Sequence, residues 1–233
     1  MKNLTVIQHT SAEFLGLMED HLEGRRIRFN YCRPFVEGTP IPHQDVVGDG
    51  LILLGGGPWG SAGGRNVPTL DAEIKLTRSC LMMGLPVIGI GLGAQILAIA
   101  SGGDSLEHKL TSHVGMAHRV NEEALAGYIP EKYPLVKYMR DKPVLSSYAQ
   151  TLAVDDEGEV ALFQVGDNSF GFIGHPGIKP AMVEDLVMEF EEAPENSSET
   201  LQSIRPMVSQ IEDSLMSIMT GLVRVTGIME ESL

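Results

Sequence analysis

This chain of 233 residues has little cysteine and no long apolar run, and each shortage excludes a class of protein. Its two cysteines, Cys32 and Cys80, are too few for a disulfide framework or a zinc motif, so we expect reduced thiols. No apolar stretch approaches the length of about 20 residues that a membrane-spanning helix needs. The N-terminus also lacks the apolar core of a signal peptide. We therefore expect a cytoplasmic protein with no membrane partner.

Basic residues are also scarce. Seventeen lysines and arginines stand against 31 acidic residues, which gives a formal net charge of −14. This balance disfavours nucleic acid and anionic membranes as partners. Three histidines, His108, His113 and His118, follow one another at intervals that fit neither one helix face nor one strand face. We therefore expect no metal site, and nothing in the sequence indicates a cofactor.

The most informative stretch runs from residue 86 to residue 102. The β-branched run Val87, Ile88 and Ile90 predicts a buried parallel strand, and residues 94–100 have a helical pattern. Between them lies the turn Gly91-Leu92-Gly93. In a strand-turn-helix of this kind, the residue at the apex projects from the carboxyl edge of the sheet towards the amides of the helix start. Nucleophiles commonly occupy that apex.

The preceding residues predict a β-α-β opening, with strands at 4–8 and 27–31 and a helix at 13–22. A long loop over 33–49 leads to a strand at 50–54, which ends in the glycine-rich segment from Gly55 to Gly64. Glycines at the end of a strand let the backbone approach a ligand, so this segment is a candidate oxyanion or ligand cradle. A flexible loop is the alternative interpretation.

We call the strand-turn-helix at residues 86–102 the elbow. After it, residues 121–142 predict a helix and a loop, and residues 144–173 predict an antiparallel run of strands. A helix over 179–190 then closes the domain. The predicted fold is α/β: a flavodoxin-like, mostly parallel sheet with helices on both faces, a small antiparallel addition and a C-terminal helix. We divide the chain into a domain at 1–192, an acidic linker at 193–200 and a heptad-patterned helix at 201–233.

Two segments resemble class I glutamine amidotransferases, most closely the stand-alone, GMP-synthase-like members. The elbow resembles the family pattern Gly-Ile-Cys-x-Gly-x-Gln-x-Leu-Ala, but Gly91 stands where the family has its nucleophilic cysteine. Residues 171–177 resemble Gly-x-Gln-Phe-His-Pro-Glu, with His175 at the general-base position and Gly177 at the place of the glutamate.

The resemblance implies a catalytically degenerate amidotransferase-like protein. Without a thiol at position 91 no thioester can form, and without the glutamate we expect the His175 imidazole to have no fixed tautomer. The crevice would instead bind a small molecule, or the chain would bind a partner protein such as a synthase in a biosynthetic complex. The residues implied to line this site are Gly56, Gly57, Gly91, Leu92 and Gln95.

Two other functions stay open. The chain could be an enzyme of changed chemistry that uses His175 as an acid or base. It could also be an amidotransferase component with a substitute nucleophile, for which Cys32 and Cys80 are the candidates. Cys80 falls among apolar residues of a predicted helix, where a buried structural thiol is the better interpretation.

The tail carries a heptad seam, in which apolar residues recur in steps of three and four. A seam of this kind favours a long helix that bundles with helices of other copies, which predicts a homo-oligomer. The alternative is a helix that folds back onto its own domain. The seam comprises Leu201, Ile204, Val208, Ile211, Leu215, Ile218, Leu222, Val225 and Met229.

Overall fold

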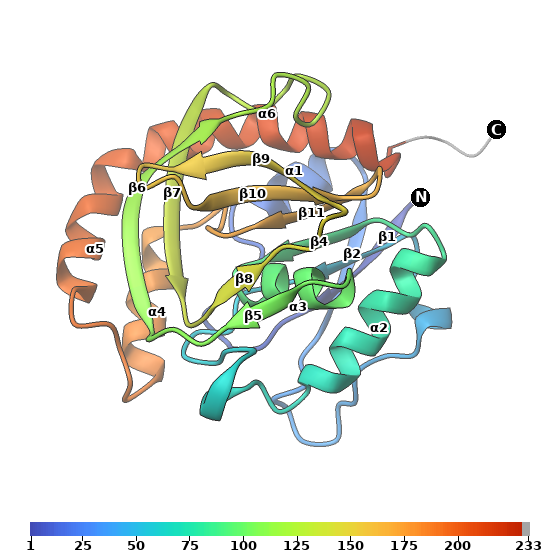
Figure 1. The fold of residues 1–233 in the computed structure, drawn as a ribbon, viewed down its shortest axis with the longest axis horizontal. Helices are drawn as coiled ribbons and strands as arrows, with labels where there is room; N and C mark the ends of the chain where they lie inside the picture. Colours follow the sequence, from blue (N-terminus) through green and yellow to red (C-terminus); the bar gives the residue numbers. More distant parts are fainter. Residues whose placement is uncertain (230–233) are drawn as a thin grey trace.

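A computed structural model describes residues 1–229, and its centre is a nine-stranded sheet with helices on both faces (Figure 1). The strand order is β2-β1-β3-β4-β11-β10-β9-β6-β7. The first five strands in this order run parallel to one another. These are β2 (Arg28–Cys32), β1 (Asn3–Ile7), β3 (Gly50–Leu53), β4 (Val87–Ile90) and β11 (Ser169–Phe172).

The other half of the sheet is antiparallel and larger than the small addition expected from the sequence. It comprises β10 (Val160–Val165), β9 (Ala149–Asp155), β6 (Thr111–Arg119) and β7 (Lys132–Met139). A separate ribbon pairs β5 (Asp104–Leu106) with β8 (Lys142–Val144). The helix expected within residues 121–142 is wrong, because β7 occupies Lys132–Met139 and the residues before it form turns. The residues of β7 are almost all buried, so they lack the period-2 alternation that would have indicated a strand.

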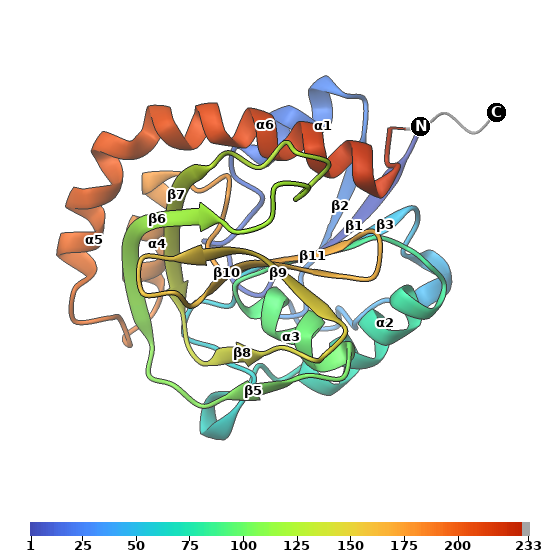
Figure 2. The same cartoon turned by 45° about the horizontal axis from the view of Figure 1, so that its top comes forward.

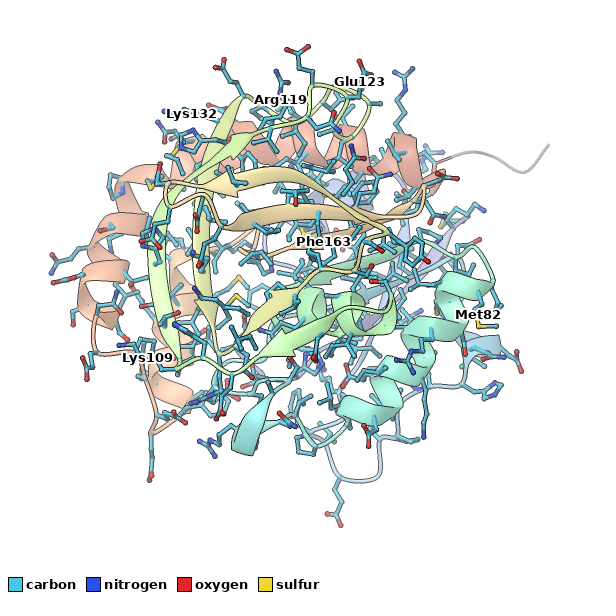
Figure 3. The ribbon with its side chains drawn as sticks, in the orientation of Figure 1. Met82, Lys109, Arg119, Glu123, Lys132 and Phe163 are labelled. Atoms are coloured by element: carbon cyan, nitrogen blue, oxygen red, sulfur yellow. The ribbon has the colours of Figure 1, made fainter. Side chains whose placement is uncertain are left out.

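Helices cover both faces of the sheet (Figure 2). Helices α2 (Leu70–Met82) and α3 (Leu92–Ala100) share one apolar core with the sheet, and α1 (Met18–Gly24) and α6 (Val208–Thr226) contribute to another. Helices α4 (Pro180–Glu189) and α5 (Ser197–Ile204) belong to a third cluster that includes residues of β7. Figure 3 shows Phe163 inside the molecule and Met82 pointing outward from α2. Three short 3₁₀ turns, η1 (Gln44–Val46), η2 (Gly63–Arg65) and η3 (Arg205–Met207), complete the elements.

Helix α1 begins later than its sequence pattern predicts. The apolar spacing suggested a helix from residue 13, but residues 9–17 form a loop and the helix starts at Met18. Gly16 has a φ of 61°, a left-handed backbone conformation that interrupts a helix and favours glycine. This loop lies over the carboxyl edge of the sheet, where it contacts the glycine-rich segment after β3.

The C-terminal helix folds back onto its own domain. Leu215, Ile218 and Leu222 are buried in the same core as residues of β1, β4 and β7. The alternative interpretation, a helix that folds back onto its own domain, therefore describes this seam, and association with other copies stays a prediction. The helix is also shorter than the heptad pattern, since η3 interrupts it around Pro206 and Gly227 ends it in a left-handed conformation.

The expected acidic linker is also partly helical, because α5 begins at Ser197. Residues 230–233, the end of the expected heptad helix, lie outside the described residues. The predicted α/β class with helices on both faces is confirmed. Within residues 1–229, no helix is both long enough and apolar enough to span a bilayer.

Candidate functional site

The elbow predicted from the sequence is present. Strand β4 ends at Ile90, and α3 begins at Leu92, so Gly91 alone makes the turn. Its φ of 56° and ψ of −113° are unfavourable for residues with a side chain. The Gly91 amide donates a hydrogen bond of 2.9 Å to the carbonyl of Phe172, which ties the elbow to β11. A Cβ added to Gly91 would lie 3.4 Å from the Cα of Gly55, so the first atom of a side chain would fit there.

The glycine-rich segment after β3 lies next to the elbow and is already occupied by a side chain. The Gly57 amide donates a 2.5 Å hydrogen bond to Oε2 of Glu13. A Cβ on Gly55 would lie 2.0 Å from Oε1 of the same carboxyl group, so Glu13 needs glycine at that position. Burial raises the pKa of Glu13 to about 7, although the bond from Gly57 opposes that rise. Glu13 therefore takes up the space where the resemblance placed an oxyanion cradle.

His9, just beyond the end of β1, supports the same segment from below. Its Nδ1 lies 3.1 Å from the carbonyl oxygen of Gly55, and its Nε2 lies 2.7 Å from Oε2 of Glu73. Both partners are acceptors, so both ring nitrogens donate and the imidazole is cationic. Burial lowers the pKa of His9, but the Glu73 carboxylate outweighs it and the net shift is upward. The hydroxyl of Thr69 donates to the other Glu73 oxygen at 2.5 Å.

A second polar cluster joins the glycine-rich segment to the turn between β7 and β8. The Asp141 carboxylate accepts hydrogen bonds of 2.9 Å from the amides of Ser61, Ala62 and His108. Gln95, on α3, donates to the carbonyl of Arg140 at 2.6 Å and accepts from the hydroxyl of Ser61 at 2.5 Å. All the polar atoms of the Gln95 side chain therefore contact this chain's own groups.

His175 follows β11 and is buried. Its Nε2 lies 2.8 Å from the carbonyl oxygen of Phe14, and its Nδ1 accepts a 3.1 Å hydrogen bond from the amide of Gly177. These two partners fix the tautomer with the proton on Nε2. The expectation that the tautomer would be undefined is thus wrong, because backbone groups replace the carboxylate. Desolvation lowers the pKa of His175 to about 4, so the ring is neutral at physiological pH.

Gly177 has no room for a side chain. A Cβ there would lie 2.8 Å from Cγ of Met18 and 3.0 Å from the amide nitrogen of Met18. The Gly177 carbonyl also accepts a 2.8 Å hydrogen bond from the amide of Leu17. The loop before α1 therefore packs on the position where the resemblance would place a glutamate.

The end of α4 covers the site. A Cβ on Gly57 would lie 3.1 Å from the ring of Phe190, and the Glu189 carboxylate accepts hydrogen bonds from the amides of Ser11 and Ala12. Glu192 pairs with Arg65 at 2.6 Å and also with Arg140. These contacts bury Gly56, Gly57, Gly91 and Leu92.

A separate cavity lies away from the elbow. It has a volume of about 300 Å³ between β7, β8 and β10, and its lining includes His108, Lys137, Lys142 and Ile173 but not Gly91. Lys137 pairs with Asp155 at 2.8 Å, and Lys142 pairs with Glu159 at 2.6 Å. In the described part of the chain, no group of three or more potential ligand side chains is placed to hold a metal ion.

The two cysteines lack the features of activated nucleophiles. Burial raises the pKa of the Cys80 thiol to about 11, and it also raises that of Cys32, whose Sγ lies 3.5 Å from the carbonyl oxygen of Pro40. Both groups are therefore thiols rather than thiolates at neutral pH.

Sequence reasoning missed the residues that fill the site. It placed Glu13 in a helix and gave no role to His9, Glu73 or Asp141. One signal was available for His9, which directly follows a buried parallel strand, where functional groups gather in α/β sheets. Glu13 gave no comparable signal, because its role depends on a contact 44 residues away in the sequence.

Comparisons with known proteins identify the family of the chain. The family model described as glutamine amidotransferase class-I matches residues 34–176. A glutamine-hydrolysing GMP synthase component of Methanothrix thermoacetophila is 33% identical over 105 residues, covering 45% of this chain and 51% of that protein. The carbamoyl phosphate synthase small chain of Ralstonia nicotianae is 28% identical over 160 residues, covering 66% of this chain and 42% of that protein. The chain thus spans about half or less of these relatives.

Solved structures match nearly the whole fold. A glutamine amidotransferase from Methylobacillus flagellatus superposes with a TM-score of 0.81 at 20% identity, covering 96% of this chain and 95% of that one. One from Thermotoga maritima gives 0.79 at 22% identity and covers 99% of both chains. At these identities the structures establish the fold alone, whereas the family model covers more than half of the sequence. The chain belongs to the class I glutamine amidotransferase family.

Proposed function

We propose that this chain is a class I glutamine amidotransferase homologue that does not hydrolyse glutamine. The observation that carries the proposal is the elbow itself, where Gly91 offers no side chain at the apex that a nucleophile would occupy. A thioester requires a thiol, and neither Cys32 nor Cys80 is ionised at neutral pH.

Three other contacts support this proposal. Glu13 occupies the Gly57 amide, which an oxyanion would otherwise need. His175 is neutral, and its two ring nitrogens contact backbone groups. Gly177 has no space for a carboxylate side chain that could orient the histidine. The same His175 contacts weigh against an enzyme of changed chemistry that uses this histidine as its acid or base.

We propose binding as the retained role. The Methanothrix and Ralstonia relatives are both named as parts of synthases, one of a GMP synthase and the other of a carbamoyl phosphate synthase. A cytoplasmic synthase is thus the kind of partner we propose for this chain. For a small molecule, the cavity beside Lys137 and Lys142 is a better candidate than the elbow. Its volume of about 300 Å³ reaches the lower limit of typical ligand pockets.

We also propose self-association through α6, and this proposal rests on the heptad pattern of the helix. The seam is buried against the chain's own sheet, so copies could use it only if α6 left the sheet. Light scattering on the full chain tests this, and a monomer at all concentrations would defeat it.

The first prediction concerns catalysis. The purified protein should release no ammonia from glutamine above the background rate, because no covalent intermediate can form at Gly91. Steady release that the His175→Ala variant abolishes would overturn the proposal.

A Gly91→Cys variant provides the positive control for the site. Mass spectrometry should verify the new thiol and circular dichroism should show a folded protein, because a first side-chain atom fits there. Ammonia release should stay at background in this variant, since His175 is still held by backbone groups. Rapid turnover of glutamine by Gly91→Cys would show that the missing thiol at position 91 is the only obstacle to catalysis.

A further inference from the structure

The glycine-rich segment after β3 has the geometry of an anion site. Gly57 has a φ of 55°, and its amide points at an oxygen 2.5 Å away. Gly55 lacks the Cβ that would collide with the same carboxyl group. Backbone amides presented by a positive-φ glycine commonly bind carboxylates and phosphates. Here the anion belongs to the chain, because it is the side chain of Glu13.

Two groups beside Glu13, the Gly57 amide and the His9 ring, offset part of the cost of burying its charge. His9 is cationic because it donates from both ring nitrogens, and its Nδ1 contacts the carbonyl of Gly55, the residue against which Glu13 packs. A buried negative charge next to a buried cation is stabilised by direct attraction. The Glu13 side chain is 4% exposed, so water screens this attraction little.

The loop that carries Glu13 is fastened mainly by polar contacts. The Glu13 amide donates to the hydroxyl of Thr10 at 3.1 Å. The Leu15 amide donates to the Tyr31 hydroxyl at 2.9 Å, and Glu189 accepts from the amides of Ser11 and Ala12. The loop therefore positions the carboxylate through contacts that do not involve Gly57.

We propose that the Gly55–Gly57 amide segment is a carboxylate-binding site that the chain fills with its own Glu13. The site takes a small external carboxylate of the formate or acetate type when the Glu13 carboxyl group is removed. This inference rests on the proposed function and deepens it, because the internally bound carboxylate packs against Gly55, the residue next to Gly91.

The test uses the full chain with Glu13→Ala, which leaves a carboxylate-sized space beside the Gly57 amide. Its melting temperature should be lower than that of the unaltered protein. Sodium formate should then raise it saturably, by about 3 °C more than sodium chloride at the same ionic strength. Glu13→Gln is the matched control: its side-chain oxygen still accepts from Gly57, so formate should add nothing beyond the salt effect. Equal effects of formate and chloride on Glu13→Ala would overturn the inference.

A second measurement needs no folded Glu13→Ala variant. In the unaltered protein, the NMR signal of the Gly57 amide should shift with pH around a midpoint near 7, as Glu13 gains a proton and its bond to Gly57 weakens. In Glu13→Gln this titration should be absent. A Gly57 signal that titrates identically in both proteins would contradict the assignment. The other titratable groups around Glu13 are His9, Glu73, Glu189 and Tyr138.

The two proposals fail separately. Ammonia release from glutamine would overturn the loss of catalysis and leave the formate response in place. A missing formate response would overturn the carboxylate site and leave the Gly91 argument intact.

Discussion

His175 shows how backbone contacts can give a buried histidine a structural role. In this fold it is a buried, neutral ring that bridges two backbone segments, from the Phe14 carbonyl to the Gly177 amide. Each hydrogen bond to the neutral ring contributes about 1 kcal/mol to folding. His175 therefore has a structural explanation that needs no catalytic partner.

The burial of His175 predicts a pH dependence of stability. Its pKa falls from 6.5 in the unfolded chain to about 4 in the folded protein, so the unfolded state binds a proton first as pH decreases. Its contribution is fully present above pH 6.5 and is lost as pH falls towards 4, by up to about 3 kcal/mol. Chemical denaturation of the unaltered protein and of His175→Gln between about pH 4 and 7 should show that the free energy of unfolding of the unaltered protein rises relative to that of the variant as pH increases.

Comparison with the variant is needed because Glu13 acts in the opposite direction. Its pKa rises from 4.5 to about 7 on folding, so its contribution is present below pH 4.5 and is lost as pH rises through 7. The difference between the two proteins removes this common effect. Identical slopes would show that His175 is not buried as a neutral ring.

At the scale of elements, α6 is the helix whose packing differs most from the expectation drawn from its sequence. Its apolar face lies on the sheet beside α1, as Figures 1 and 2 both show. Gly221 permits a close contact between α6 and the connection from β6 to β7, since a Cβ there would lie 2.7 Å from Cβ of Leu125. The glycine that weakens the isolated helix is thus required by its packing.

Leu215 provides the test of this arrangement. It is completely buried, so Leu215→Ala should lower the free energy of unfolding by about 2–5 kcal/mol through lost contacts and a cavity. Its neighbour Met216 is 61% exposed, and Met216→Ala should change stability by less than about 0.5 kcal/mol. Urea denaturation at two protein concentrations measures both values. A denaturation midpoint of the unaltered protein that falls on dilution would indicate that the seam packs between copies instead.

At the scale of the whole molecule, the proposed division at residue 192 becomes testable because the tail shares its core with the sheet. Leu215, Ile218 and Leu222 belong to the same apolar cluster as Leu4, and Ile204 and Ile211 to the same cluster as Leu186. Two parts that share a core are expected to unfold together. The division at 192 separates the α/β pattern from the heptad pattern. Both apolar clusters, however, contain residues from each side of it.

The full chain should therefore unfold in one cooperative transition. A chain that ends at Glu192 would expose the sheet face under α6, and we expect it to lose that transition and to bind the dye ANS. Differential scanning calorimetry and ANS fluorescence on the two chains measure this. A truncated chain that melts cooperatively without binding ANS would support an independent domain at 1–192.

The sequence by itself determined the parts that depend on neighbouring residues. The elbow at Gly91, the strands β1 to β4 and the helices α2 to α4 follow from local periodicity, glycine positions and apolar runs. Gly91 at the apex of the elbow, on which the proposed lack of glutamine hydrolysis rests, is also read from the sequence without coordinates. Such features are decided within a short stretch of neighbouring residues, so their signals survive in the linear pattern.

Only the tertiary structure decided what fills the site and what covers the sheet. Glu13 reaches Gly57, His9 reaches Glu73, and α6 packs on the sheet through contacts between distant segments. Strand β7 was missed because burial on both faces removes alternation. A heptad seam states only that a helix face must be buried, and the space available beside the sheet determines which surface buries it.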